Sequence, residues 1–258
     1  MADDRPRFRV RPDQYSPLTR PAGPLPTPPA TAATGDVERA LWRFEASFDE
    51  HVYSAALLEG NTYTLPEVRT LIDGYTVGGH TRLETAQVED IVAAHRLVHR
   101  LVRDGEFELS KDVSDRVNAA IAAHETLEPG VFRNTGAVRS QAATVQIPGR
   151  GVVRGADPGD DGSAMVALCE RILEECRGLA DPVEGAAHYF CQAILAQPYL
   201  DGNKRTAKLV ASGHLLTHGI DAILVPAKDR AAYNDLLGDL FWTRDENPLT
   251  AYLRTLVA

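Results

Sequence analysis

The chain has 258 residues, of which 44% are hydrophobic and 24% charged, a composition ordinary for a globular protein with one large domain or two small ones. Its formal net charge of −9 makes the whole chain a poor candidate for nucleic-acid binding, which rewards clustered Lys and Arg. No stretch approaches the ~18 apolar residues of a membrane span, and the N-terminus lacks the apolar core of a signal peptide.

Residues 1–36 are rich in proline, which disfavours both helices and central strands. We predict an extended N-terminal arm here, followed by one domain over residues 37–258. The arm is either a disordered tail or a segment laid along the domain surface, with Tyr15, Leu18 and Leu25 as candidate anchors. No internal repeat and no later shift in composition marks a second domain boundary.

Helices are predicted along most of the domain. Apolar residues recur at three- and four-residue steps from Val37, which predicts a helix that ends at Gly60, a favourable left-handed C-terminal residue. The next helix begins after Thr64, whose side chain can form a capping box with Glu67. Further helices are expected over residues 85–103, 111–124, 163–178, 183–197, 204–218, 229–241 and 248–257.

One stretch is typical of β-structure. In residues 143–155, ATVQIPGRGVVRG, two short β-favouring runs flank the turn signal of residues 148–151, which predicts a hairpin. The fold class is therefore mostly α with one hairpin.

The three cysteines, Cys169, Cys176 and Cys191, have neither the paired spacing of a zinc site nor the even count of a disulfide framework. They are typical of reduced, mostly buried thiols. Together with the lack of a signal peptide, they predict a cytoplasmic protein.

The sequence QPYLDGNKRTAKL, residues 197–209, places a Gly-Asn turn and three cations at the start of a predicted helix. Pro198 disfavours the helical conformation at Gln197, so the preceding helix should end there. The next helix begins near Asn203, and its first turn leaves N–H groups without intrahelical partners at the positive end of the helix dipole. Because Gly202 permits close backbone approach, the stretch is a candidate anion site.

Charged side chains extend this candidate site. Arg205 and Lys208 share a helix face, and Asp201 offers the hard oxygen that a phosphate-bridging cation prefers. On spacing alone, a Gly-Asn turn between two core helices with solvated cations on the outer face remains an alternative.

The stretch resembles the signature of the Fic/Doc family, His-Pro-Phe-x-Asp/Glu-Gly-Asn-Gly-Arg-x-x-Arg, over the motif range 197–208. EGNTYTLPEV from Glu59 is similar to the family's Glu-Gly-Asn element, and the hairpin at about 143–154 falls where the family has a flap. Tyr233 matches a tyrosine commonly found after the motif. The resemblance covers most of the chain from residue 37 and implies a Fic-like helical bundle with one β-hairpin flap. The matching motif positions are Pro198, Tyr199, Asp201, Gly202, Asn203 and Arg205.

The resemblance implies transfer of a nucleotide moiety, usually AMP from ATP, onto a hydroxyl of a target protein. Asp201 would hold Mg²⁺, Arg205 would stabilise the transferred phosphate, and the flap would align a strand of the target by β-augmentation. The nucleotide-binding residues implied by the family are Gly202, Asn203, Lys204, Arg205, Lys208 and Tyr233.

Gln197 occupies the position of the family's catalytic histidine. An amide has no usable basic lone pair near neutral pH, so Gln197 cannot be the general base. General-base assistance contributes about 10²–10⁴-fold, and its loss leaves slow chemistry at best. Either nucleotide binding persists without useful transfer, or another group supplies the base; an engineered substitution is a further alternative.

Two lysines and one glutamate also bear on the nucleotide site. Lys204 replaces the second glycine, as in the phosphotransferase branch represented by Doc, and Lys208 replaces the last arginine but cannot form its two parallel hydrogen bonds. In the family, the glutamate before Gly-Asn obstructs the site by pairing with that arginine, so Glu59 is expected to face Lys208 as a regulatory residue. The alternative is an exposed glutamate beside a helix-ending glycine.

These features predict a Fic-like nucleotide-binding protein with impaired or altered catalysis, using ATP or a related nucleotide with Mg²⁺. The alternatives are an active nucleotidyltransferase or Doc-like kinase that uses another base, and a noncatalytic module that binds a partner strand through the flap. The expected partner is a target protein that docks at the flap; neither a membrane nor a nucleic acid is expected.

Overall fold

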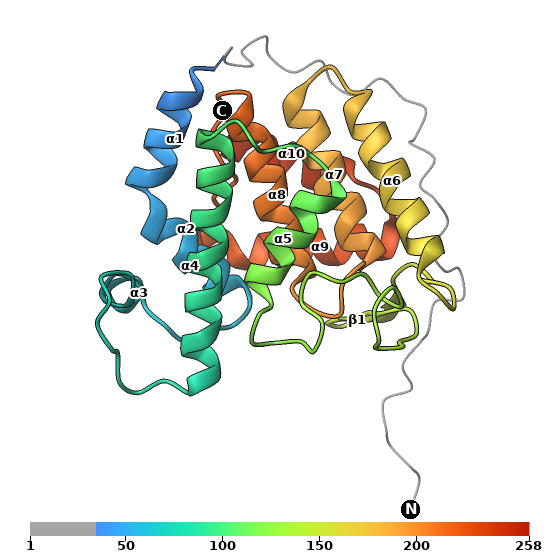
Figure 1. Ribbon diagram of the computed structural model, residues 1–258, viewed down its shortest axis with the longest axis horizontal. Helices are drawn as coiled ribbons and strands as arrows, with labels where there is room; N and C mark the ends of the chain where they lie inside the picture. Colours follow the sequence, from blue (N-terminus) through green and yellow to red (C-terminus); the bar gives the residue numbers. More distant parts are fainter. Residues whose placement is uncertain (1–34, 258) are drawn as a thin grey trace, which may run out of the picture.

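Two helices, α7 (Pro182–Ala196) and α8 (Asn203–Thr217), lie at the centre of the computed structural model, which describes residues 35–257 (Figure 1). All but the last two residues of the predicted arm lie outside the described range. The other helices are arranged around the central pair, and their bounds are α1 (Val37–Ala46), α2 (Phe48–Leu58), α3 (Leu65–Ile72), α4 (Arg82–Arg103), α5 (Lys111–Ile121), α6 (Ser163–Arg177), α9 (Arg230–Thr243) and α10 (Asn247–Leu256).

The residues at the start of α7 favour a helix. Asp181 caps α7 by accepting a hydrogen bond from the Val183 N–H at 2.9 Å, and Pro182 occupies the first helical position. Most residues of α7 and α8 are buried. Helix α7 packs between α6 and α8, while α8 also packs against α5 and α4, so α8 is held on several sides.

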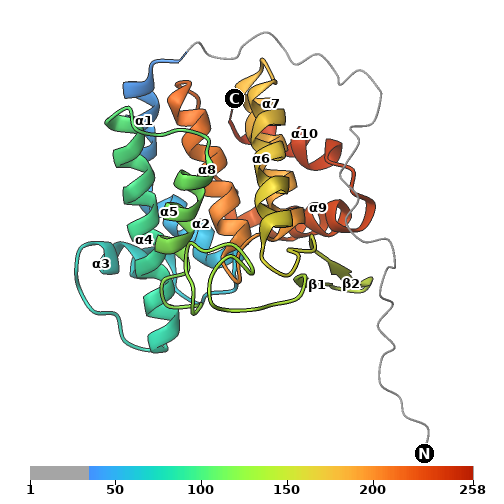
Figure 2. The ribbon, with the colours of Figure 1, turned by 45° about the vertical axis from the view of Figure 1, so that its right-hand side comes forward.

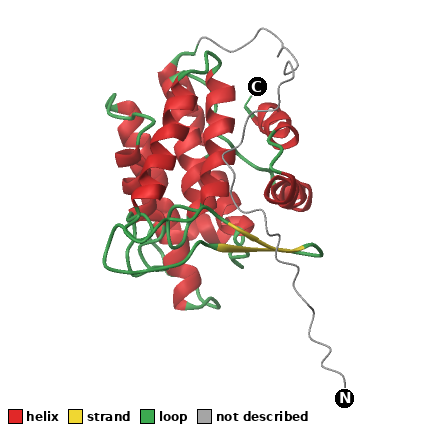
Figure 3. Ribbon diagram, turned by 90° about the vertical axis from the view of Figure 1, so that its right-hand side faces the viewer, coloured by secondary structure: helices red, strands yellow, loops and turns green. Residues whose placement is uncertain are grey.

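The predicted hairpin is confirmed as strands β1 (Thr144–Ile147) and β2 (Gly151–Arg154), which pair antiparallel. Gly149 and Gly151 take φ values of 72° and 125° in the turn, a conformation that glycine adopts without strain. Within the described residues this is the whole of the β-sheet. Figures 2 and 3 show the hairpin at one end of the helical bundle, below α6 and beside α9.

The single helix predicted from Val37 to Gly60 is wrong at one point, because it is divided at Ser47 into α1 and α2. The Ser47 hydroxyl donates to the Arg43 carbonyl at 2.9 Å, a local bond of the kind that bends helices. The capping box of Thr64 and Glu67 is confirmed at the start of α3. In the described part of the chain, no helix is long and apolar enough to cross a membrane.

Candidate functional site

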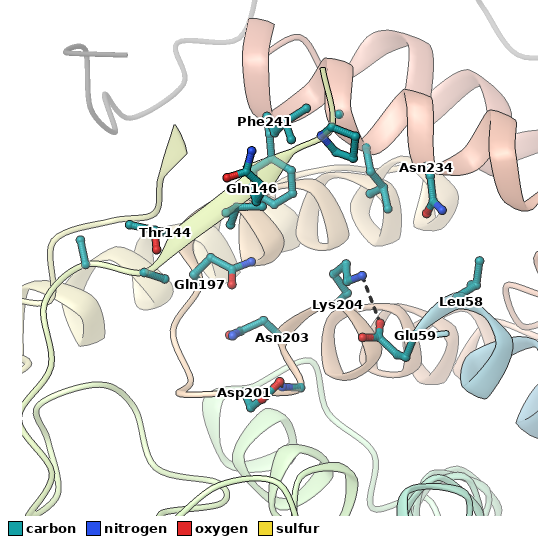
Figure 4. A pocket seen from close by; sticks show the side chains of 18 of the residues that line it. Leu58, Glu59, Thr144, Gln146, Gln197, Asp201, Asn203, Lys204, Asn234 and Phe241 are labelled. Carbon is teal, nitrogen blue, oxygen red and sulfur yellow. Dashed lines mark hydrogen bonds and ion pairs between the residues drawn. The ribbon is translucent and has the colours of Figure 1, made fainter. Parts of the chain in front are cut away.

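A cleft of about 800 Å³ lies between the start of α8, the end of α2, the hairpin and α9 (Figure 4). This volume is in the range of pockets that hold small molecules. Its lining includes Gln197 and residues 200–204 of the motif, Glu59 at the end of α2, and residues 141–148 along β1. Helix α9 contributes Asn234 and Phe241, among others. The motif, the Glu59 element and the hairpin, far apart in sequence, therefore meet at one cleft.

The loop between α7 and α8 is closed by a two-way hydrogen bond. Asn203 accepts from the Tyr199 N–H at 2.8 Å through Oδ1 and donates to the Tyr199 carbonyl at 2.9 Å through Nδ2. Arg133, from another part of the chain, stabilises the same loop. Its Nε donates to the Gln197 carbonyl at 3.0 Å, and its Nη2 donates to the Leu200 carbonyl at 3.3 Å. The side chain of Asn203 is thus used to shape the loop.

Glycine is required at position 202, the N-cap of α8. Its φ of 73° lies in the left-handed region, and a Cβ there would come within 3.1 Å of Ile121 Cγ2 and 3.2 Å of Asn118 Nδ2. Asn118 Nδ2 in turn donates to the Asp201 carbonyl and to Thr206 Oγ1, both at 3.0 Å. Asn118 therefore ties α5 to the loop and to α8 from the buried side.

The first turn of α8 presents unpaired backbone donors. The Gly202 N–H is taken by Asp201 Oδ1 at 2.6 Å, and the Thr206 N–H bonds to the Gly202 carbonyl. Among the described residues, the N–H groups of residues 203–205 have no partner, and no side chain caps the helix. Such donors at the positive end of a helix dipole bind anions.

Gln197 ends α7 in the left-handed conformation, with φ 56° and ψ 54°, immediately before Pro198. Its amide Nε2 donates to the Ile194 carbonyl at 2.6 Å. Because the NH₂ group must face that carbonyl, Oε1 is the end left for a further contact. An amide oxygen accepts a hydrogen bond from a hydroxyl but does not remove its proton.

The expected pairing of Glu59 with Lys208 is wrong, because Glu59 Oε1 lies 3.2 Å from Lys204 Nζ, inside the cleft (Figure 4). Lys208 is buried one turn further along α8, behind the cleft lining. Burial lowers the pKa of the Lys208 ammonium to about 8, while Glu59 acts to raise it and Lys204 to lower it. The side chain of Lys204 is long enough for its ammonium group to reach Glu59. Lys208 lies in the interior of the bundle.

Two further residues assigned by the motif lie behind the cleft lining. Arg205 is buried, and its Nη2 forms an ion pair with Glu125 Oε2, beyond the end of α5; Asp201 Oδ1 lies 3.8 Å from the same nitrogen. Tyr233 is buried on α9, where burial and the nearby Glu59 carboxylate raise the pKa of its hydroxyl. Neither side chain is part of the cleft wall.

Asp201 is the motif carboxylate that the cleft leaves accessible, with its side chain 58% exposed. No group of three or more His, Cys, Asp or Glu in the described range could hold a metal ion unaided. Mg²⁺ commonly takes one or two carboxylates and completes its shell with water and substrate phosphates. Asp201 beside the α8 N-terminus fits that kind of site.

One edge of β1 is open along the cleft. The Gly155 N–H donates to the Ala143 carbonyl at 2.8 Å, and hydrogen-bonded pairs alternate along an antiparallel ladder. The backbone groups of Thr144 and Gln146 therefore point away from β2, and they have no backbone partner within the described residues. An extended peptide could add to this edge.

Sequence reasoning missed Arg133, Asn118 and Glu125, which support the motif from other parts of the chain. Arg133 and Asn118 could have been suspected, because a loop with several carbonyls and a left-handed glycine needs donors that the motif itself does not supply. Glu125 had no local signal, since its role depends on the packing of α5 against α8.

The model of the Fic/DOC family matches residues 85–215. A protein adenylyltransferase Fic from Nematostella vectensis is 26% identical over 219 residues, which cover 84% of this chain and 46% of the relative. One from Aedes aegypti is 27% identical over 211 residues, covering 81% of this chain and 40% of the relative. The chain thus spans less than half the length of these curated relatives.

Solved structures agree on the fold. Residues 134–508 of Fic-1 from C. elegans superpose with a TM-score of 0.68 at 22% identity, over 84% of this chain and 62% of that one. A Fic domain-containing signaling protein from Bacteroides thetaiotaomicron gives 0.67 at 23% identity, over 87% of both chains.

Proposed function

The chain belongs to the Fic/DOC family, and on that premise we propose that the cleft binds ATP or a related nucleotide with Mg²⁺. In this proposal residues 37–258 form one Fic-like domain related to protein adenylyltransferases, the name carried by its relatives. Its capacity to transfer AMP to a protein hydroxyl is impaired or altered, because Gln197 stands at the position of the base.

The observation that carries the proposal is the set of backbone donors in the first turn of α8 that the described part of the chain leaves free. Three consecutive backbone N–H groups of residues 203–205 are unpaired among the described residues, and they border the cleft beside Lys204. Helix N-termini of this kind stabilise phosphate groups through both hydrogen bonds and the dipole. Asp201 would hold Mg²⁺, which neutralises phosphate charge when bound.

Three residues of the motif helix and α9 have supporting roles in this proposal. Arg205 offers positive charge to the phosphates from the buried side of the first turn, and Lys208 adds charge from deeper in the bundle. Tyr233 packs behind the part of α9 that faces the cleft. Glu59 is regulatory, since its carboxylate neutralises Lys204 where a nucleotide phosphate would lie.

The chemistry proposed for Gln197 is limited to orientation. With Nε2 held by the Ile194 carbonyl, Oε1 can accept a hydrogen bond from a target hydroxyl and align it. The hydroxyl proton has no acceptor of suitable basicity in Gln197, so the positioned-base contribution of about 10²–10⁴-fold is absent. The open edge of β1 would align the target segment that carries the hydroxyl.

Calorimetric titration of the full chain with Mg-ATP, followed by a labelled-ATP transfer assay that includes auto-modification, tests this function. We expect binding with little or no transfer. Robust transfer by the unaltered chain would support the alternative of an active transferase or kinase with another base. Absence of nucleotide binding would contradict the proposal and favour a noncatalytic module, an alternative that the open β1 edge supports.

A further inference from the structure

One nitrogen of the Arg205 guanidinium has a partner among the described residues, and the other two have none there. Its side chain is only 4% exposed, and Nη2 is paired with Glu125. Nε and Nη1 are buried and have no hydrogen-bond partner within the described residues. A buried donor without a partner is unfavourable, so these two nitrogens favour an acceptor that arrives from outside the chain.

A directed series of hydrogen bonds fixes the other side of Glu125. Asn61 accepts from the Tyr63 N–H at 3.0 Å and donates to the Glu84 carbonyl at 3.0 Å, so the orientation of its amide is determined. Its Nδ2 also donates to Gln87 Oε1 at 2.9 Å. Gln87 must then present Nε2 to Glu125, and Nε2 donates to Oε1 at 2.5 Å.

The residue at position 125 therefore needs two acceptor atoms at the end of its side chain, one for Gln87 and one for Arg205. Oε1 accepts from Gln87 and Oε2 accepts from Arg205. An ionised carboxylate meets both demands, whereas an amide of the same shape would set its NH₂ group against one of the two donors. The series runs from the α2–α3 loop through α4 and the segment after α5 to α8, and it begins two residues after Glu59.

We propose that Glu125 is a positioning residue for Arg205, itself oriented by Gln87 and Asn61, and that Arg205, which lies behind the cleft lining, offers its unpartnered nitrogens to phosphate oxygens of the nucleotide. This inference rests on the proposed nucleotide-binding function. Glu125 is not part of the cleft wall and touches no substrate, so it acts through Arg205 alone. Its removal affects the part of the ligand that carries phosphate and leaves the nucleoside part unaffected.

Glu125→Gln and the exchange Gln87→Glu with Glu125→Gln test the proposal. The exchange restores a full set of donors and acceptors, because a carboxylate at 87 accepts from Asn61 and from Gln at 125, whose oxygen accepts from Arg205. The affinities of the wild-type chain and both variants for Mg-ATP and for adenosine are measured by calorimetry. Thermal unfolding confirms that each variant is folded.

We expect Glu125→Gln to weaken Mg-ATP binding about tenfold, in the range seen when a residue that orients a ligand-binding group is lost, with adenosine affinity unchanged. The exchange should recover most of the loss. Unchanged or tighter Mg-ATP binding in Glu125→Gln, an equal loss for adenosine, or no recovery in the exchange overturns the inference. If Glu125→Gln does not fold, Gln87→Leu should give a smaller loss of Mg-ATP affinity, with adenosine affinity unchanged. Unchanged Mg-ATP affinity in that variant overturns the inference.

Absence of Mg-ATP binding in the wild-type chain overturns the proposed function, and this inference with it. Wild-type binding that Glu125→Gln leaves intact overturns the inference alone.

Discussion

The first turn of α8 carries two cation–carboxylate pairs in unlike surroundings. Lys204 and Glu59 meet inside the cleft, with side chains 39% and 20% exposed. Arg205 and Glu125 meet behind it, with side chains 4% and 10% exposed. Adjacent residues on one helix thus place one ion pair in contact with water and the other in the interior.

The difference in burial decides what each pair can do. An exposed pair contributes about 0–1 kcal/mol, because water and salt replace the partner at little cost. Breaking a buried pair by removing one partner costs about 3–5 kcal/mol, since an uncompensated charge stays inside. Under the proposed function we therefore expect the cleft pair to exchange Glu59 for a phosphate, and the buried pair to act as a fixed support.

The largest expected effect is on the rate of transfer from ATP in the cleft. Gln197→His with Glu59→Gly should raise labelled transfer from ATP by up to about 10²–10⁴-fold, because imidazole supplies the missing base beside an opened anion site. Histidine is among the residues that tolerate the left-handed conformation at this position. The measurement includes auto-modification, since the target protein is not identified.

Gln197→Ala with Glu59→Gly is the control for that experiment. If unaltered protein already transfers label and Gln197→Ala does not change the rate, another residue is the base. Silence in the histidine variant despite Mg-ATP binding would mean that the lysines hold the nucleotide in an unproductive position, which favours the interaction module.

The second prediction compares the same substitution at the two pairs. Glu125→Ala should lower the free energy of unfolding by about 3–5 kcal/mol, because it leaves the Arg205 charge buried without its partner. Glu59→Ala should lower it by no more than about 1 kcal/mol. Urea unfolding of both variants measures the two values, and losses of similar size would remove the contrast between the pairs.

A third prediction uses pH to probe the interior behind α8. His95 is buried beside His51 and Lys208, and burial lowers its pKa to about 4, against the opposing hydrogen bond to the Ile91 carbonyl. Between pH 6.5 and 4 the unfolded chain binds this proton and the folded chain does not, so stability falls as pH falls, by about 3 kcal/mol from this group.

His95→Gln should flatten that pH dependence, which unfolding curves at pH 7, 5.5 and 4.5 measure. His99, one turn along α4 and only half-buried, gives the matched control His99→Gln. Equal slopes in wild type and His95→Gln would contradict a buried neutral imidazole at position 95.

Features that depend on neighbouring residues could be predicted from the sequence, whereas contacts between residues far apart in the sequence could not. The end of α7 at Gln197, the start of α8 at Asn203 and the hairpin turn were predictable, because each depends on local chemistry: Pro198, an unpaired helix start and glycines with positive φ. The Glu59–Lys204 pair was not, since the choice between Lys204 and Lys208 depends on where the end of α2 lies relative to α8. The same holds for Glu125, whose relation to Arg205 spans 80 residues.

The most direct test of a nucleotide site controlled by Glu59 is a calorimetric titration of wild type and Glu59→Gly with Mg-ATP at low salt. Removal of the carboxylate frees Lys204 and takes a negative charge out of the cleft, so affinity for Mg-ATP should rise about fivefold, in line with the loss of a partly exposed ion pair. Asp235→Asn is the matched control, because Asp235 also lines the cleft but has no cationic partner within the described residues. A larger gain in Glu59→Gly than in Asp235→Asn supports a nucleotide site gated by Glu59, and equal affinities in wild type and Glu59→Gly would contradict it.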